Sequence, residues 1–179
     1  MDLIRIKKQF ILIILLSVGP LCSIRAQSAD SLQVQLSRKW MHSKTYALKL
    51  AASMPEQYYD FKPVPVEMSF KEQLLHLADN IQWLASSYLL VPALKDEKDL
   101  TNLTKADVLK IVGDAYDIGL KAHQSVSPAR LNEIVSFFAG NLTRRQILIL
   151  MHDHQTHHLG QLIVYLRLKG ISPPEYVGW

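Results

Sequence analysis

Apolar residues recur at helical spacing through four long stretches of the chain, residues 30–54, 69–91, 105–125 and 143–170. The clearest stripe runs through the second stretch and contains Leu74, Leu77, Ala78, Ile81 and Leu84. No stretch shows the alternation typical of a strand, and Ile134 to Phe138 is interpreted as a short extended or irregular piece. The pattern therefore predicts an all-α fold, a four-helix bundle.

Short polar motifs mark where the predicted helices begin and end. Ser69 to Glu72 and Thr143 to Gln146 both have the form of a capping box, and Thr104 is a candidate N-cap for the third helix. Gly170 suits the left-handed position that closes the last helix, and the prolines that follow forbid its continuation. These boundaries leave helices long enough to share one bundle core.

The first 26 residues are typical of a secretory signal and are not expected to belong to the fold. A charged segment containing Arg5 precedes an apolar run from Phe10 to Val18, which is too short to span a membrane as a helix. Ala26 is the expected cleavage point, although Ile24 is not the small residue usual three positions before a cut. We expect a domain over residues 27–179 that is periplasmic or secreted, with an uncleaved anchor or a lipid-modified Cys22 as alternatives.

Charge and cysteine content narrow the chemistry that the mature chain can perform. The signal holds four of the 20 basic and one of the 16 acidic residues, so the remaining chain carries 16 basic and 15 acidic residues. Such a balance gives no electrostatic footprint for nucleic acid. The only cysteine, Cys22, leaves with the signal, so no disulfide, thiolate ligand or cysteine nucleophile is expected.

The last predicted helix carries four of the seven histidines between His152 and His158. His154 and His158 take positions in its apolar seam and, being four residues apart, lie on one face about one turn apart. His157 falls at the edge of that face, and His152 lies nearly opposite. Two imidazoles at this spacing can hold a metal ion, although a core histidine is also often just hydrogen-bonded.

A useful metal site requires a third protein ligand, and His76 in the second helix is the candidate. By periodicity it lies away from the apolar stripe and shares its face with Asn80 and Trp83. The pattern alone leaves open whether His76 is functional. Trp83 and Tyr165, at helical spacing, are more typical of a core than of a pocket lining.

Three passages make the chain similar to the DinB-like family of bacterial four-helix bundles that bind metal. They are MPEQYYDFKPVPVEMSFKEQLLHLADNIQWL from Met54, HQTHHLGQL from His154 and YLRLKGISPPEY from Tyr165. The resemblance implies a metal held by His76, His154 and His158. Gln161 matches the family and is expected to line the site, together with His157, Asn80 and Trp83. Leu159 departs from it, because the family often has Arg there.

Three neutral imidazoles would leave at least one open position on a divalent metal, with zinc or nickel expected. The first hypothesis is a metal-dependent hydrolase that activates a bound water and acts on a small-molecule substrate. A non-catalytic metal or ligand-binding module and a metal-dependent thiol S-transferase are the alternatives. We expect no nucleic-acid partner and no transmembrane segment in the mature chain, and a homodimer stays open.

Overall fold

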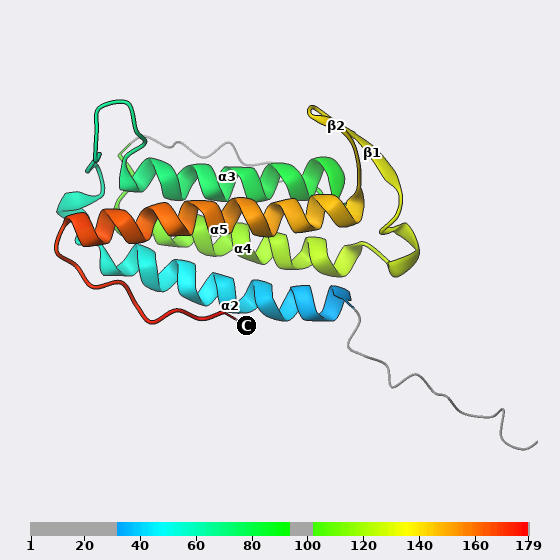
Figure 1. Cartoon of the computed structure of the whole chain (residues 1–179), viewed down its shortest axis with the longest axis horizontal. Coiled ribbons are helices and arrows are strands. Elements are labelled where there is room, and N and C mark those ends of the chain that lie inside the picture. Colours follow the sequence, from blue (N-terminus) through cyan, green and yellow to red (C-terminus); the bar gives the residue numbers. More distant parts are fainter. Residues whose placement is uncertain (1–31, 94–101, 179) are drawn as a thin grey trace, which may run out of the picture. The chain divides into compact units, whose positions relative to one another are not determined.

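The computed structural model describes residues 32–93 and 102–178, so the predicted signal segment lies outside the described residues. Its described part contains four α-helices, as the apolar pattern predicts (Figure 1). They are α2 (Leu32–Ser53), α3 (Phe70–Tyr88), α4 (Lys105–Ser125) and α5 (Arg144–Leu168). Two single-turn 3-10 helices, η1 (Glu56–Tyr58) and η2 (Pro128–Arg130), lie in the connections.

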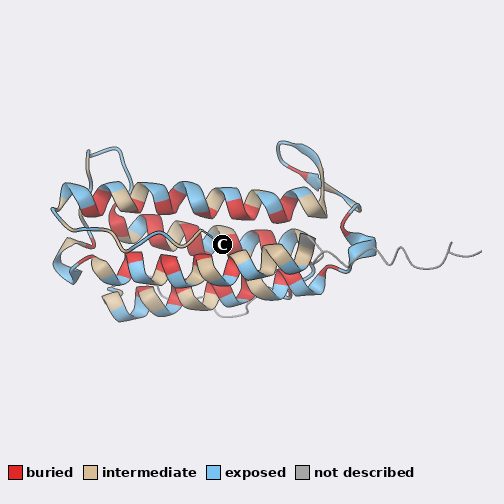
Figure 2. Ribbon diagram, turned by 60° about the horizontal axis from the view of Figure 1, so that its bottom comes forward, coloured by how far each residue is buried: buried red, intermediate tan, exposed pale blue. Residues whose placement is uncertain are grey.

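The four helices form one bundle in which α4 and α5 each pack against both α2 and α3. Lys105 Nζ donates to the carbonyls of Ala52 and Met54, so α4 begins beside the end of α2. The Arg144 side chain donates to the carbonyl of Tyr88, so α5 begins beside the end of α3. Helix α5 is therefore antiparallel to α3, and buried residues line the sides where helices face one another (Figure 2).

The predicted helix starts are confirmed by side-chain caps. At Ser69, Thr104 and Thr143 the hydroxyl accepts from the backbone N–H three residues on, and that residue's side chain accepts from the cap's own N–H. Reciprocal bonds of this kind satisfy donors that a helix N-terminus leaves unpaired. Gly170, at φ +71°, follows the end of α5 in the left-handed conformation predicted for it.

A short hairpin lies where the sequence indicated an extended or irregular piece at Ile134 to Phe138. Strands β1 (Ile134–Phe137) and β2 (Gly140–Thr143) make an antiparallel hairpin between α4 and α5, with Phe137 opposite Gly140. Gly140 has φ +117°, a conformation open to glycine, at the turn. Each strand has only four residues, too few for alternation to stand out in the sequence. The fold is thus a helical bundle with one hairpin at its end (Figure 1).

The centre of the bundle is built around Trp40 of α2, which is completely buried. Its indole Nε1 donates to the carbonyl of Tyr116 at 2.8 Å, and its ring packs 5.0 Å from the ring of Tyr116. Gly119 permits this approach, since a Cβ at that position would lie 2.3 Å from Trp40 Cζ2. The contact between α2 and α4 therefore depends on a glycine inside a helix.

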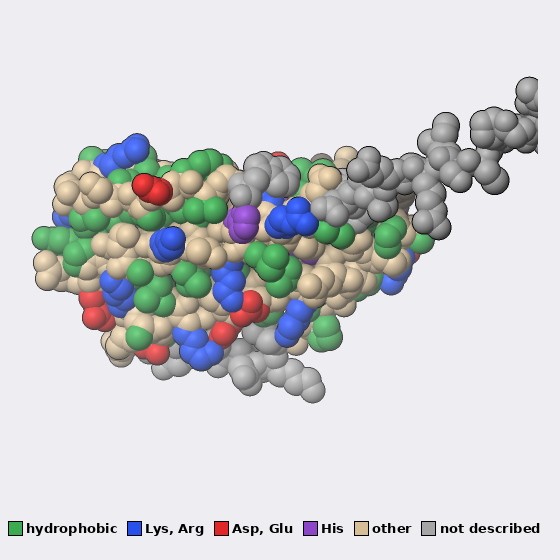
Figure 3. Space-filling view, turned by 90° about the horizontal axis from the view of Figure 1, so that it is seen from below, with side chains coloured by type: hydrophobic (Ala, Val, Ile, Leu, Met, Phe, Trp, Pro, Cys, Tyr) green, Lys and Arg blue, Asp and Glu red, His purple; other side chains and the backbone are tan. Residues whose placement is uncertain are grey.

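The described surface is mixed in charge and carries no membrane-spanning element. On the face seen in Figure 3, basic and acidic side chains are interspersed among apolar ones. None of the helices in the described residues combines the length and the apolarity needed to cross a bilayer.

Replacing Gly119 with Ala should destabilise the protein by about 1–3 kcal/mol, the usual range for overpacking a core. Gly113→Ala is the matched control in the same helix, because its added Cβ would come no closer than 4.0 Å to Leu48. That control should be stabilising by up to about 1 kcal/mol through helix propensity. Urea unfolding of both variants measures the difference, and equal midpoints would contradict the packing of Trp40 on Gly119.

Candidate metal centre

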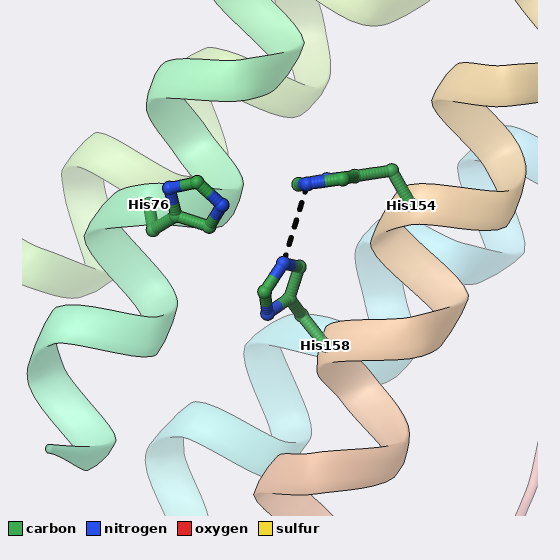
Figure 4. A group of neighbouring side chains, drawn as sticks. All are labelled: His76, His154 and His158. Atoms are coloured by element: carbon green, nitrogen blue, oxygen red, sulfur yellow. Dashed lines mark hydrogen bonds between the residues drawn. The ribbon is translucent and has the colours of Figure 1, made fainter. Parts of the chain in front are cut away.

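The structure brings together the three histidines that the sequence singled out. His154 and His158 project from successive turns of α5 toward His76 of α3 (Figure 4). The ring centroid of His76 lies 5.2 Å from that of His154 and 4.8 Å from that of His158. The rings of His154 and His158 are 4.5 Å apart. Because α3 and α5 are adjacent and antiparallel, one imidazole from α3 can face the pair on α5.

The nitrogen atoms of these rings converge as ligand atoms do. One nitrogen from each histidine can be chosen so that all three lie within 4.8 Å of one another. His154 Nε2 and His158 Nε2 are 3.3 Å apart and share a hydrogen bond (Figure 4). One of these two nitrogens must carry the proton of that bond. A metal ion between them would replace this proton, since imidazole ligands bind through an unprotonated nitrogen.

Burial holds the two histidines of α5 in the neutral form that a metal requires. Desolvation, followed by the neighbouring imidazoles, lowers the pKa of His154 to about 4. The same causes, in the same order, lower the pKa of His158 to about 4. Both values lie well below the usual value of about 6.5, so both rings are uncharged at neutral pH. Neither ring therefore has to release a proton from a charged form before its unprotonated nitrogen can bind a metal ion.

Gln73, which the sequence analysis did not identify, contacts the site directly. It lies one turn before His76 on α3, is 2% exposed, and accepts a hydrogen bond from His158 Nδ1 at 2.5 Å. In the sequence its only signal is a polar residue three positions from His76, which is too weak to interpret. His154 Nδ1, by contrast, is buried and has no hydrogen-bond partner among the described residues.

The other predicted pocket residues are only partly gathered at the site. His157 is exposed, with its ring 5.1 Å from that of His158, and Gln161 Nε2 donates to His157 Nε2 at 2.9 Å. Gln161 Oε1 and Asn80 Oδ1 are buried without a hydrogen-bond partner in the part of the chain that the structure describes. Polar side chains thus border the cluster on both helices, Asn80 one turn beyond His76 and Gln161 one turn beyond His158.

Trp83 does not lie in the core, where its spacing placed it. Its side chain is 37% exposed and packs 5.9 Å from Phe137 and 6.3 Å from Phe138 of the hairpin. Tyr165, by contrast, is 4% exposed and donates to the carbonyl of Met68. Leu159, the departure from the family pattern, is buried in the apolar core and not in a polar contact with the cluster.

His152 faces away from the cluster, as its position on the helix predicts, and pairs instead with His123 of α4. The two Nε2 atoms are 2.9 Å apart, and His123 Nδ1 donates to the carbonyl of Gly119. With Nδ1 protonated, His123 accepts through Nε2 and His152 donates. The Trp40 ring packs 5.1 Å from each imidazole. This second histidine pair is therefore a hydrogen-bonded part of the core, in which His152 Nδ1 is left without a partner among the described residues.

A cavity of about 430 Å³ adjoins His76 between the start of α3 and the loop before it. Its wall combines the apolar Pro65, Val66, Met68 and Leu75 with Lys62, Glu67 and Glu72. Lys62 and Glu72 form an ion pair. Volumes of this size fit a small organic molecule. His76 is thus shared between the histidine cluster and a space where such a molecule could bind.

The donor set of the cluster fits a borderline transition metal. Three imidazole nitrogens suit zinc, nickel, copper or iron, whereas calcium and magnesium prefer oxygen ligands. The residues present therefore fit a divalent metal without selecting one.

Fold and site together define a helical bundle with a three-histidine cluster between two antiparallel helices. The chain belongs to the DinB family, whose model matches residues 27–178. This match bears out the family resemblance of the three sequence passages.

Individual relatives agree with this assignment. The chain is 26% identical over 149 residues to the uncharacterized protein YjoA of Bacillus subtilis (strain 168), covering 76% of this chain and 90% of the relative. Among solved structures, the DinB-like YjoA from Bacillus subtilis has a TM-score of 0.66 at 19% identity, over 79% of this chain and 96% of that one. A DinB-like protein from Bacillus cereus ATCC 10987 has a TM-score of 0.67 at 17% identity, over 79% and 95%. These structures are similar in fold.

Replacing His158 with Ala should weaken metal binding by about 100-fold or more, which exceeds the usual effect of removing an outer partner of a ligand. His157→Ala is the matched control, because this neighbouring histidine is exposed and bonds to Gln161. Its affinity should stay close to that of the unaltered protein. Titration of untagged, metal-stripped protein with zinc against a competing chelator measures both. Equal losses would mean that the wrong histidines have been assigned as ligands.

Proposed function

We propose that the chain is an exported metalloprotein in which His76, His154 and His158 hold one divalent metal ion, zinc or nickel, for hydrolysis of a small-molecule substrate. The single observation that carries the proposal is the convergence of three imidazole nitrogens within 4.8 Å from two different helices. Convergence of this kind costs free energy without a ligand, because imidazole nitrogens that are removed from water need other partners.

The ligand count supports a reactive site over a purely structural one. Structural zinc sites use four protein ligands, whereas catalytic ones keep three and leave a position open. A divalent ion held in this way lowers the pKa of coordinated water to about 7 and so supplies a nucleophile at neutral pH. The cavity beside His76 is the space in which a substrate would reach that position.

The surrounding residues have separate roles in this proposal. His76 joins the ion to the substrate cavity, and the apolar Val66, Met68 and Leu75 would hold an apolar part of the substrate. His157 is the exposed titratable group nearest to His158 and is the candidate to exchange protons with solvent. Asp79 and Asp153 are both exposed, which is typical of solvated charges.

Export is the second element of the proposal and rests on the charged and apolar pattern of residues 1–26. Cleavage after Ala26 would leave a mature protein that begins at Gln27 in the periplasm or the medium. The intact mass of protein isolated from its native host measures this. A full-length chain recovered from the cytosol would contradict export and favour the thiol-transferase alternative, since small thiols are kept there.

Cobalt substitution tests whether the site has an open, reactive position. The visible bands of the cobalt protein should shift with pH near neutrality and on addition of small anions, because an open position exchanges water for other ligands. His158→Ala protein treated with cobalt in the same way is the negative control, because it should not retain the ion. A spectrum that ignores pH, anions and thiols alike would overturn the enzyme proposal and leave a non-catalytic binding module.

The same experiment separates the two chemistries. A strong sulfur-to-metal band on addition of a low-molecular-weight thiol, without a pH response near neutrality, would favour thiol transfer over hydrolysis. Zinc and nickel titrations of the metal-stripped protein then decide between the two proposed ions.

A further inference from the structure

We propose that Gln73 is a positioning residue that fixes His158 with its proton on Nδ1, so that the lone pair on Nε2 points to His76 and His154. This inference rests on the proposed metal site and deepens it, because it states how one ligand is prepared before the ion arrives. It also means that the group accepting the proton of this ligand is uncharged.

The geometry of the contact sets the direction of the proton. Gln73 Oε1 accepts from His158 Nδ1 at 2.5 Å, and the carbonyl oxygen of an amide has no proton to give. His158 Nδ1 must therefore carry the hydrogen, and in the neutral ring Nε2 carries none. His154 Nε2 then donates in the 3.3 Å contact with His158 Nε2.

The position of Gln73 on α3 makes the contact a rigid one. Gln73 and His76 are three residues apart on one helix, so they lie on neighbouring turns and face the same strip of α5. Gln73 is 2% exposed and His158 is 7% exposed, so water does not compete freely for either group. One helix thus contributes both a ligand and the support for another ligand on the facing helix.

Gln73 is an uncharged acceptor, and this has a consequence for the ion. A carboxylate in this place would draw the Nδ1 proton more strongly and make the imidazole a more basic ligand. An amide holds the ring without adding negative charge, so a bound ion keeps more of its positive charge for other ligands. We therefore infer that the site is arranged for an electrophilic ion and not for the tightest binding.

Histidine side-chain nitrogen NMR of the metal-free protein at pH 7 tests the tautomer directly, without any metal or activity. In the unaltered protein, His158 should show a protonated Nδ1 and an unprotonated Nε2. A proton on Nε2 would overturn the proposal, because Gln73 would then present its NH₂ group to the ring and the nitrogen facing the cluster would be blocked.

Two substitutions at Gln73 test the consequence for metal binding. Gln73→Leu removes the acceptor and should lower zinc affinity by about 10–100-fold, the range for loss of an outer partner. Gln73→Glu keeps an acceptor oxygen, should retain the Nδ1 proton, and should restore or raise the affinity. Unchanged affinity and unchanged tautomer in Gln73→Leu would overturn the proposal.

Gln155→Leu is the matched control, because Gln155 is also 2% exposed and loses buried hydrogen bonds to Tyr116 and Ser43. It should cost stability without changing the tautomer of His158 or the zinc affinity. An equal loss of affinity in this control would mean that Gln73→Leu acts through general destabilisation, which would also overturn the proposal. If His158 has the expected tautomer but the unaltered protein binds no metal, the proposed function fails while the role of Gln73 stands.

Discussion

The constraint on which the rest of this structure depends is that α5 is buried along two faces at once. It packs against both α2 and α3, so polar side chains on either face leave water and must find partners inside the bundle. On the α2 and α4 side, His152 bonds to His123, and Gln155 bonds to Tyr116 and Ser43. On the α3 side, His158 bonds to Gln73 and to His154. Each face of α5 thus carries hydrogen bonds to neighbouring helices, although His152 Nδ1 and His154 Nδ1 are buried without a partner among the described residues. These bonds help to set the register of α5 against its neighbours.

Burial also determines what these histidines can do. Desolvation lowers the pKa of His152 to about 3 and of His154 and His158 to about 4, so the neutral ring is the stable one in the fold. A neutral imidazole donates one hydrogen bond through its protonated nitrogen and offers a lone pair on the other, and its neighbours decide which nitrogen does which. The Nδ1 contact between His158 and Gln73 leaves Nε2 free for the cluster. Capping at Ser69 helps to set where α3 begins and therefore where Gln73 and His76 meet α5.

Much of the fold and of the candidate metal site could be predicted from local patterns, because those patterns report local physics. Capping boxes at Ser69 and Thr143 marked helix starts that the structure confirms, since a cap satisfies backbone donors within four residues. The i, i+4 spacing placed His154 and His158 on one face for the same reason, and the family resemblance supplied His76.

The contacts that the sequence did not predict join residues that are far apart in the chain. Trp83 lies at the surface against Phe137 and Phe138 of the hairpin, a contact between residues more than 50 positions apart. Gln73 became visible only when α3 and α5 were brought together.

The two histidine pairs on α5 show why histidine content alone does not define a metal site. His152 and His123 have their Nε2 atoms 2.9 Å apart, closer than the 3.3 Å between His154 and His158. Yet His123 is completely buried and His152 is 4% exposed, and the Trp40 ring packs against both. That pair belongs to no group of three possible metal ligands in the described residues. The pair facing α3 has His76 opposite it, and His76 also lines a cavity. A third nitrogen and access from a cavity are therefore what make the second pair a candidate for chemistry.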